Sequence, residues 1–390
     1  MVEHASTRRW LLVVGFLLLA VNLRPALTTL PPVLDQVQRN FGISSGVAGL
    51  LTTAPVLCFA LISPLAALLA RRVGLQHALT LFLLLVLAGS MIRGIGTPTL
   101  FLGTVLVGAG IGLANVLLPA VVKQHFAARA ALMTGLYMMF MGVGAALGAA
   151  ATVPLERATG WPAATAAWGG LCVVALVFWA ARREPARQPI PEPARVHGIR
   201  ILVRSPLAWQ LTLFMGLQSL GFYCILTWLP SLLVDQGIGP GHAGLLLALA
   251  NLCGIPASLA VPLISHRLRS QRALAIGLGL LGGIPLTGLM IAPLAAPYLW
   301  VVLLGLAQGG AISLALTLVI LRAASIQQAA ELSGMVQGFG YALAASGPFV
   351  VGVLHDQSGG WVVPLGFLLA CLAAQACFGA LAGRPRHIAG

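Results

Sequence analysis

Twelve long apolar stretches are the feature of this sequence that most limits its fold. A helix that crosses the hydrocarbon core of a bilayer needs about 20 mostly apolar residues. In lipid, only helices and closed barrels satisfy every backbone polar group. Because the chain contains twelve such stretches, we predict an all-α membrane protein with twelve transmembrane helices. The stretches cover residues 10–34, 44–70, 76–95, 98–122, 129–154, 161–181, 205–234, 241–265, 272–292, 297–321, 329–354 and 361–382.

The composition leaves little room for a second kind of domain. Hydrophobic residues make up 59% of the 390 residues and charged residues 8%, whereas soluble domains carry about 25% charged residues. Soluble enzymes, secreted disulfide scaffolds and disordered regulators are therefore excluded. The longest polar stretch, residues 182–204, lies between the sixth and the seventh apolar stretch. We predict a six-helix bundle at 1–181, a cytoplasmic linker at 182–204 and a second six-helix bundle at 205–390.

Membrane orientation explains the strong positive charge of the chain. A formal net charge of +14 would otherwise suggest a nucleic-acid partner. With both termini in the cytoplasm, most Lys and Arg residues fall in predicted inside segments, as the positive-inside rule requires. The exceptions are Arg39, Arg93 and Arg157 in outside segments and Arg24 within the first span. We predict a multi-pass protein of the lipid bilayer with both termini cytoplasmic and no nucleic-acid partner.

The sequence repeats itself at about half its length. The motif G-I-x-x-G-x-A-G-L-L begins at Gly42 and again at Gly237, an offset of 195 residues. Two six-helix repeats of the same orientation, related by a pseudo-twofold axis, are typical of transporters whose halves move around a central site. Other matched pairs are Cys58 with Cys253 and, at an offset of 199, Thr28 with Thr227.

Several short stretches resemble a known transporter family. They are residues 22–28, 112–119, 216–219, 222–223, 228–230, 332–335, 340–341, 347–348 and 354–356. On these stretches the chain resembles the major facilitator superfamily and, within it, the family of cyanate and nitroimidazole transporters. The resemblance implies the major facilitator fold in a bacterial inner membrane. It also implies a monomer without a cofactor that carries a small anionic or nitroaromatic solute.

One loop departs from that resemblance. The superfamily's cytoplasmic connection between its second and third helices usually reads like G-x-x-x-D-R-x-G-R-R. Here Arg71 stands where the acid belongs, and the matching segment of the second repeat, His266–Arg269, also lacks an acid. The carboxylate latch of the superfamily is therefore not carried over to this chain.

Arg24 is the one formal charge that the sequence places near the middle of a span. It lies about 21 Å along the first helix from Trp10, and a charge at that depth should face the bundle interior or water. Asp35 lies about 16 Å further along the same helix, beyond pairing distance. A guanidinium presents a planar set of donors that suits a small oxyanion or a nitro group. We predict that Arg24 contacts the solute; bracing of the first helix against backbone carbonyls is the alternative.

Neutral polar residues on other predicted cavity helices are further candidates. An amide or hydroxyl in hydrocarbon needs a partner, and that partner is either the solute or another helix. For Asn22 we favour helix bracing. Tyr223 matches Arg24 at the offset of 199, and Trp228 is either an interfacial residue or a cavity wall. The predicted solute-binding set is Asn22, Arg24, Asn115, Gln218, Tyr223, Trp228, Gln337 and Tyr341.

Two charged residues are candidates for a gate. Arg322 and Glu331 bracket the predicted connection between the tenth and eleventh helices, where they would pair on the cytoplasmic side; a purely topological role for Arg322 is the alternative. All eight acids lie in loops or at span ends, which leaves no buried relay for protons. We expect uniport, exchange, or a proton that travels with the solute. The six cysteines show no metal-binding spacing, so we predict no metal.

The predicted function is a secondary transporter that moves a small anionic or nitro-bearing solute by alternating access. The first alternative is a multidrug exporter of lipophilic compounds, which a lone arginine disfavours because a cation exporter needs an acid in its cavity. A non-transporting membrane sensor is the second. No span carries paired carboxylates, a histidine cluster or a Ser–His arrangement, so we do not expect an enzyme.

Overall fold

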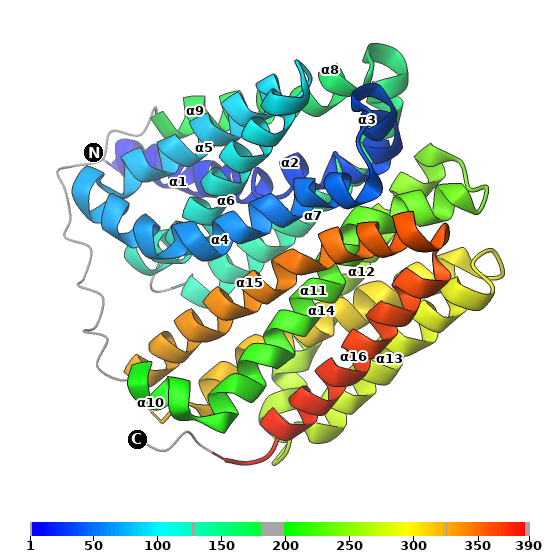
Figure 1. Ribbon diagram of the computed structural model, residues 1–390. Helices are drawn as coiled ribbons and strands as arrows, with labels where there is room; N and C mark the ends of the chain where they lie inside the picture. The colour runs from blue at the N-terminus through cyan, green and yellow to red at the C-terminus, as the bar shows by residue number, and fades with distance from the viewer. Residues whose placement is uncertain (1, 127–128, 181–198, 325, 387–390) are drawn as a thin grey trace. The chain divides into compact units, whose positions relative to one another are not determined.

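All regular secondary structure is helical in the part of the chain that the structure, a computed structural model, describes (Figure 1). That part comprises residues 2–126, 129–180, 199–324 and 326–386. Contacts divide the chain into two units. Unit 1 comprises Met1–Gly42 and Ala54–Pro191, and unit 2 comprises Ile43–Thr53 and Glu192–Gly390. Most of the predicted linker lies outside the described residues, and its last residues form the short helix α10 (Ile199–Arg204).

Unit 1 contains the first predicted span as a broken helix. The break follows from Pro25, Pro31 and Pro32, because proline lacks an amide hydrogen and disfavours a helical conformation in the preceding residue. The pieces of this span are α1 (Val2–Val21), α2 (Pro25–Thr28), the short 3-10 helix η1 (Pro31–Val33) and α3 (Leu34–Phe41). The other helices that contribute to unit 1 are α4 (Ser45–Val73), α5 (Leu75–Ile92), α6 (Thr97–His125), α7 (Ala130–Thr159), α8 (Trp161–Ala166) and α9 (Gly169–Ala180).

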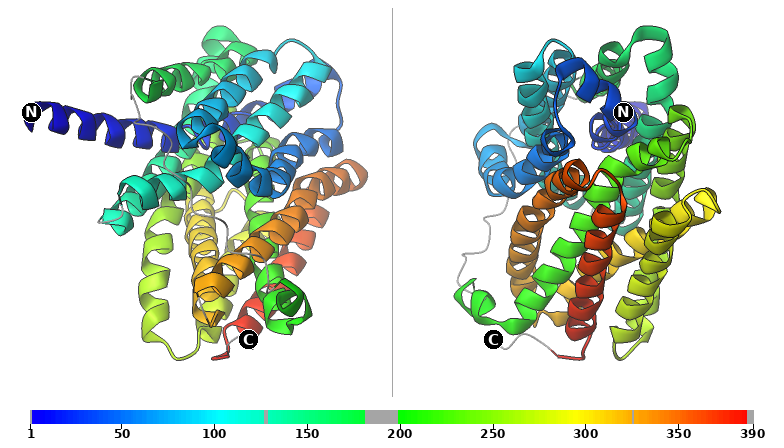
Figure 2. Two further views of the ribbon diagram at one scale, coloured as in Figure 1. Left: turned by 90° about the vertical axis from the view of Figure 1, so that its left-hand side faces the viewer. Right: turned by 45° about the vertical axis from the view of Figure 1, so that its right-hand side comes forward.

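In unit 2 the corresponding first span is one continuous helix, α11 (Pro206–Asp235). It packs along α15 (Ile326–Ser358), and α13 (Arg272–Ile291) packs along α16 (Val362–Ala382), as the views in Figures 1 and 2 show. The remaining pair, α12 (Pro240–Arg267) and α14 (Pro297–Arg322), is also in close contact.

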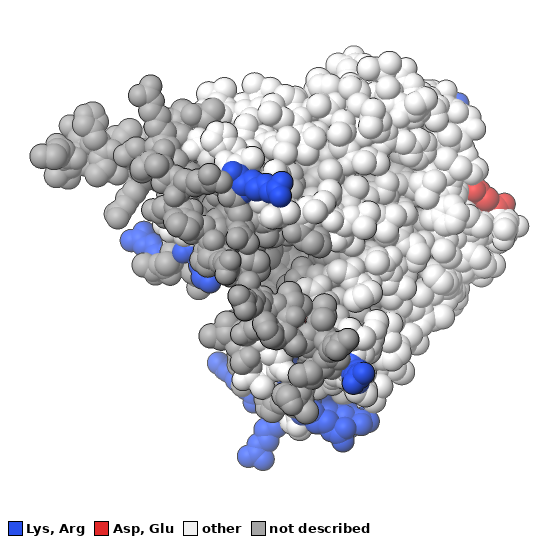
Figure 3. All heavy atoms as spheres, turned by 60° about the vertical axis from the view of Figure 1, so that its left-hand side comes forward, with Lys and Arg blue, Asp and Glu red and all other residues white. Residues whose placement is uncertain are grey.

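The structure confirms the twelve predicted spans. Within the described residues, twelve helical segments are long and apolar enough to cross a membrane. The clearest difference is in the first span, which runs from Trp10 to Phe41 because η1 and α3 continue it past the predicted end. Large apolar side chains such as Leu61, Leu263 and Ile320 are exposed. The face in Figure 3 is broadly uncharged, with Lys and Arg in small groups. Such a surface suits contact with lipid.

The sequence repeat corresponds to the same helix packing inside each unit. In unit 1, α5 contacts α6 and α9; in unit 2, α13 contacts α14 and α16. The matched cysteines show this at the atomic level. A Cβ placed on Gly108 of α6 would lie 3.2 Å from the Cβ of Cys58, and one on Gly305 of α14 would lie 3.0 Å from the Cβ of Cys253. Each repeated cysteine therefore packs against a glycine of the neighbouring helix.

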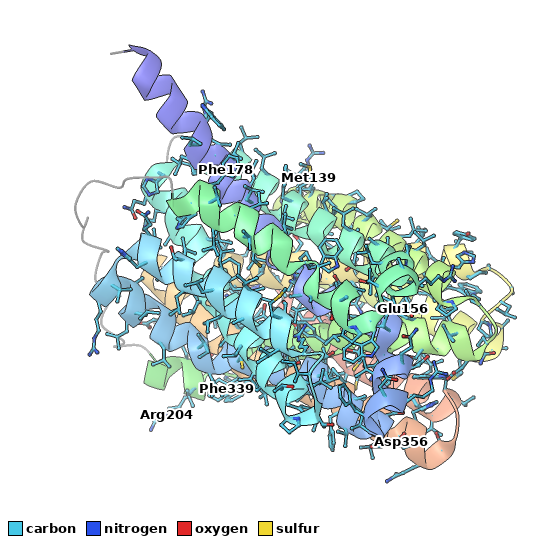
Figure 4. All side chains as sticks on the ribbon, turned by 90° about the horizontal axis from the view of Figure 1, so that it is seen from above. Met139, Glu156, Phe178, Arg204, Phe339 and Asp356 are labelled. Carbon is cyan, nitrogen blue, oxygen red and sulfur yellow. The ribbon has the colours of Figure 1, made fainter. Side chains whose placement is uncertain are left out.

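The first turns of α4 pack with unit 2 rather than unit 1. The carboxylate of Asp356, labelled near the end of α15 in Figure 4, accepts hydrogen bonds from the backbone N–H groups of Ser45 (3.2 Å) and Gly46 (2.8 Å). Close packing follows along α15, where a Cβ on Gly49 would lie 2.4 Å from the carbonyl oxygen of Pro348. Because the rest of α4 belongs to unit 1, this helix connects the two units.

Removing the Asp356 carboxylate is expected to loosen the start of α4. An acidic cap satisfies free N–H groups and interacts favourably with the helix dipole, and its loss destabilises a helix end by roughly 1 kcal/mol. In Asp356→Ala, amide hydrogen exchange at Ser45 and Gly46 should be several-fold faster than in the wild type. Asp356→Asn keeps an acceptor and should show a smaller change. Removal of a carboxylate from α7 by Glu156→Ala is the control; unchanged exchange in Asp356→Ala would contradict the capping role.

Candidate functional site

The break in the first span places Arg24 at the start of a new helix. After α1 ends at Val21, Asn22, Leu23 and Arg24 are not helical, and Arg24 (φ −119°, ψ −35°) precedes Pro25, the first residue of α2. Its carbonyl accepts from the N–H groups of α2. Non-helical backbone at this depth in a membrane protein is tolerated where it is buried in protein or lines a cavity. Such broken helices commonly form transporter binding sites.

The Arg24 side chain is half-buried within unit 1. Its guanidinium interacts electrostatically with the side chain of Tyr137 on α7. The hydroxyl of Thr28 donates to the carbonyl oxygen of Arg24 at 3.3 Å, which ties α2 back onto the same residue. Arg24 is therefore held by its backbone at the start of α2, and its guanidinium lies near enough to Tyr137 for an electrostatic interaction. The half-buried position of Arg24 is consistent with the prediction that this side chain points into the bundle rather than toward lipid.

Glycines on α7 allow the broken segment to lie directly against that helix. A Cβ on Gly144 would be 2.4 Å from the carbonyl oxygen of Val21, and one on Gly148 would be 2.3 Å from the Thr28 Oγ1 atom and 3.0 Å from the Cα of Pro25. No side chain fits at these two positions without moving the break. Close helix approach through small residues is the usual packing mode in membranes, and here it fixes the segment that carries Arg24.

Tyr223 is the counterpart of Arg24 in unit 2 by its bonding as well as by its sequence offset. The hydroxyl of Thr227 donates to the carbonyl oxygen of Tyr223 at 2.7 Å, as that of Thr28 does to Arg24. Gly347 of α15 takes the place of Gly148 of α7: a Cβ on it would lie 2.7 Å from the Sγ atom of Cys224, which stands where unit 1 has proline. The two units thus differ at this position mainly by an arginine and a helix break.

Asn22 bonds entirely within unit 1. Its Nδ2 atom donates to the carbonyl oxygens of Leu18 (2.8 Å) and Leu171 (3.3 Å), and its Oδ1 atom accepts from the Cys172 thiol (3.0 Å). The side chain is 3% exposed. This arrangement matches the bracing role that the sequence favoured, since it joins α1 to α9.

Gln218 and its neighbours form a polar contact between α11 and α14. The Nε2 atom of Gln218 donates to the Oε1 atom of Gln308 at 3.3 Å, and the hydroxyl of Ser219 donates to Gln218 at 3.2 Å. On its other side, Gln308 lines a small cavity of about 20 Å³ together with Gln375 of α16. That volume holds about one water molecule. Of this pair, the predicted solute-binding set contains Gln218 alone, and the structure pairs it with an amide from another helix.

The other predicted residues are distributed over unit 2 and α6. Asn115 on α6 and Tyr341 on α15 are half-buried, and Tyr341 packs against the apolar core of unit 2. Gln337 donates to the hydroxyl of Ser333, one turn earlier, at 2.8 Å. Trp228 is 3% exposed and donates to the carbonyl oxygen of Pro348 at 2.9 Å. Because Trp228 is buried against α15, it does not occupy the interfacial position that the sequence left open.

The structure gives the gate candidate Arg322 other partners than the predicted acid. Its Nε atom donates to the carbonyl oxygen of Ala382 at 2.9 Å, and its Nη2 atom donates to Gln271. These bonds connect the end of α14 to the start of α13, at Gln271, and to the end of α16, at Ala382. Glu331, in the first turns of α15, is half-buried. Arg322 therefore braces helix ends within unit 2, and a paired gate with Glu331 stays a prediction.

Arg93 is a buried charge that sequence reasoning missed. Placed in a short connection between α5 and α6, it was counted among the outside charges, yet its side chain is 1% exposed. Its Nη1 atom donates to the carbonyl oxygen of Ala26 in α2 at 2.6 Å. Burial lowers the pKa of the Arg93 guanidinium to about 9, so the group still carries its charge at neutral pH. No sequence signal distinguishes this arginine from one that extends into water.

Potential metal ligands do not cluster in the described residues. Among them, no group of three or more His, Cys, Asp or Glu side chains is arranged to hold a metal ion. The acids in the described part of the chain all lie near helix ends; they are Glu3, Asp35, Glu156, Asp235, Glu331 and Asp356. The charged chemistry of the interior therefore rests on arginines.

Comparison with known proteins places this geometry in context. A family model described as Major Facilitator Superfamily matches residues 11–348. The 2-nitroimidazole transporter of Escherichia coli (strain K12) is 41% identical over 386 residues, which cover 98% of both chains. The cyanate transport protein CynX of the same organism is 30% identical over 362 residues, 91% of this chain and 92% of that protein. A solved bacterial homolog of the human lysosomal transporter Spinster has a TM-score of 0.77 at 18% identity over 96% of both chains, which shows the fold alone.

Proposed function

The chain belongs to the major facilitator superfamily, and on that premise we propose that this transporter carries a small anionic or nitro-bearing solute by alternating access. The observation that carries the proposal is Arg24, a guanidinium at a break in the middle of the first span. Relatives named for 2-nitroimidazole and for cyanate support the same solute class. Both solutes present oxygen or nitrogen acceptors to a cationic donor.

Arg24 supplies the attraction in this proposal. The guanidinium offers parallel N–H donors to two acceptor atoms of one solute, such as the oxygens of a nitro group. In this proposal the hydroxyl of Tyr137, which interacts electrostatically with Arg24, adds a neutral hydrogen-bonding group to the contact. A low-dielectric environment strengthens each of these interactions relative to water.

The polar residues Asn115, Gln218, Tyr223, Gln337 and Tyr341 contribute to solute recognition in the same proposal. Their half-buried or buried amides and hydroxyls supply neutral donors and acceptors, which set shape and selectivity rather than charge. In this proposal Asn22 and Trp228 act indirectly: Asn22 holds the end of α1 against α9, and Trp228 holds α11 against α15.

The proposal is tested by uptake into proteoliposomes that contain the purified protein. The panel consists of cyanate, nitrate, 2-nitroimidazole and a lipophilic cation. Saturable uptake of the anions or the nitro compound, absent from protein-free vesicles, is expected. Uptake of the cation alone, with no competition by the anions, would support a multidrug exporter instead. Binding of an anion without flux would indicate a sensor.

We expect that a pH gradient does not drive accumulation of a permanently ionised anion. Proton-coupled carriers commonly use a buried carboxylate or histidine as the relay, and the described acids lie near helix ends. The measurement is nitrate uptake into proteoliposomes with and without an imposed gradient, with the membrane potential clamped to zero. Accumulation of nitrate above the external concentration would reveal a proton site on the protein.

The orientation and setting of the transporter complete the proposal. Both termini face the cytoplasm of a bacterial inner membrane, and the unit of function is a monomer. The concentration of Lys and Arg in alternate connections supports the orientation through the positive-inside rule.

A further inference from the structure

We propose that Arg93 is a positioning residue for the solute-binding arginine, because it holds the helix break on which Arg24 sits. The inference rests on the proposed role of Arg24. Arg93 donates to the carbonyl oxygen of Ala26, two residues beyond Arg24 and one beyond Pro25. It thereby fixes the short helix α2 to the end of α5.

The contact meets a need that the helix break creates. Residues in a continuous helix have their carbonyls bonded to N–H groups one turn later. α2 contains four residues, too few to satisfy its own carbonyl groups. A guanidinium that reaches the Ala26 carbonyl replaces the missing helical donor. The backbone of α2 then has a fixed position from which the Arg24 side chain extends.

Unit 2 provides an internal comparison that supports this assignment. Arg24 corresponds to Tyr223 at the offset of 199 residues. Arg93 and Ala292 correspond by their place in the fold, because each follows directly after the third helix of its unit, α5 and α13. Where α11 is continuous and Tyr223 replaces Arg24, the second arginine is absent as well. The two arginines and the helix break thus occur together in one unit and are missing together from the other.

Stability alone does not account for an arginine at this position. Among the described residues, the Nε and Nη2 atoms of Arg93 have no hydrogen-bond partner, although the side chain is 1% exposed. A buried cation with unsatisfied donors is unfavourable relative to an apolar side chain. The stem of Arg93 is tightly enclosed, since a Cβ on Gly103 would lie 3.0 Å from its Cγ atom. The cost of burying the unpaired Nε and Nη2 atoms of Arg93 is therefore offset only by its hydrogen bond to the Ala26 carbonyl oxygen of α2.

The test compares solute affinity in single and double variants. In proteoliposomes, Arg93→Met is expected to raise the KM for cyanate about tenfold, as large as the smaller losses seen when residues that orient metal ligands are removed. The maximal rate should change less than about twofold, because Arg93 does not touch the solute. Arg93→Lys keeps a charged donor on a long chain and should restore most of the affinity. Arg157→Met removes an exposed arginine from the end of α7 and should leave the KM unchanged.

A double-variant cycle separates positioning from direct contact. In an Arg24→Lys background, where the planar donor group is already lost, Arg93→Met should raise the KM by about twofold or less, because coupled residues are not additive. An equal factor in both backgrounds, or an unchanged KM in the Arg93→Met single variant, would overturn the inference. Unchanged KM values in the Arg24 variants would instead overturn the proposed function.

Stability measurements distinguish positioning from bracing. The midpoint of thermal unfolding in detergent should be equal or higher in Arg93→Met, since unsatisfied buried donors are removed. A lower midpoint with an unchanged KM would assign Arg93 a purely structural role. If Arg93→Met does not yield folded protein, Arg93→Gln carries the same KM expectation with a polar side chain, because its amide ends two bonds short of the Nη1 position.

Discussion

Replacement of Arg24 by alanine is expected to raise the KM for cyanate uptake by roughly 10- to 100-fold. Hydrogen bonds to a charged group contribute about 1.5–3 kcal/mol, which corresponds to about that range in affinity. Arg24→Lys keeps the charge but loses the planar pair of donors, so an intermediate KM is expected. The measurement is the initial rate of uptake into proteoliposomes over a series of cyanate concentrations.

Two comparisons make the Arg24 result specific. Arg39→Ala removes an exposed arginine from the last turn of α3, in the same span, and should not change the KM. Tyr137→Phe removes the hydroxyl that interacts with Arg24 and should raise the KM less than Arg24→Ala does. Equal KM values for the wild type, Arg24→Ala and Arg24→Lys would leave the guanidinium with a bracing role alone.

The second large effect is expected at Gly148, where α7 contacts the broken segment. A valine there would place its Cβ 2.3 Å from the Thr28 Oγ1 atom and 3.0 Å from the Cα of Pro25. Because Pro25 Cα is backbone, α2 or α7 must move, and overpacking of this kind destabilises a protein by about 1–3 kcal/mol or more. We expect Gly148→Val to lower the thermal midpoint in detergent by several degrees and to raise the KM of whatever folded protein remains.

Two matched glycines separate packing from intrinsic helix propensity. Gly135→Val makes the same replacement on the same helix, where a Cβ would meet no atom within 4 Å, and its thermal midpoint should stay near that of the wild type. Gly347→Val introduces a clash with Cys224 and Leu220 in unit 2, and should lower the thermal midpoint as Gly148→Val does. If Gly148→Val and Gly135→Val unfold at the same temperature, the close approach of α7 does not stabilise the break.

The proposed solute contact lies at a local interruption of helical structure. Proline after Arg24 interrupts the first span, and Arg93 donates a hydrogen bond to the Ala26 carbonyl oxygen within the interrupted segment. In the second unit a cysteine stands in place of that proline and the helix continues. A substitution as small as this makes two halves of similar sequence chemically different. The asymmetry gives one half the positive charge on which the proposed solute contact depends.

The length and number of the apolar stretches were sufficient to predict most of the fold. Spans of about 20 apolar residues have few alternatives in a bilayer, so their number followed directly from the sequence, and the family comparison agrees. The repeat was also visible in the sequence, where Cys58 matches Cys253. The structure agrees, because each of these cysteines packs against a glycine of the neighbouring helix. Arg24 could be identified from the sequence because it is a charge within an apolar stretch, and such a charge has few stable positions in a membrane protein.

Tertiary structure alone decided how the polar groups are used. Arg93 and Arg157 look alike in sequence, each in a short connection, yet the structure buries the first and exposes the second. Gln218 donates a hydrogen bond to Gln308, and Arg322 donates to Gln271 rather than pairing with Glu331. Apolar burial depends on composition along the chain, which a sequence reveals directly. A hydrogen bond depends on the position of a partner that is distant in sequence, and only the folded arrangement of helices specifies it.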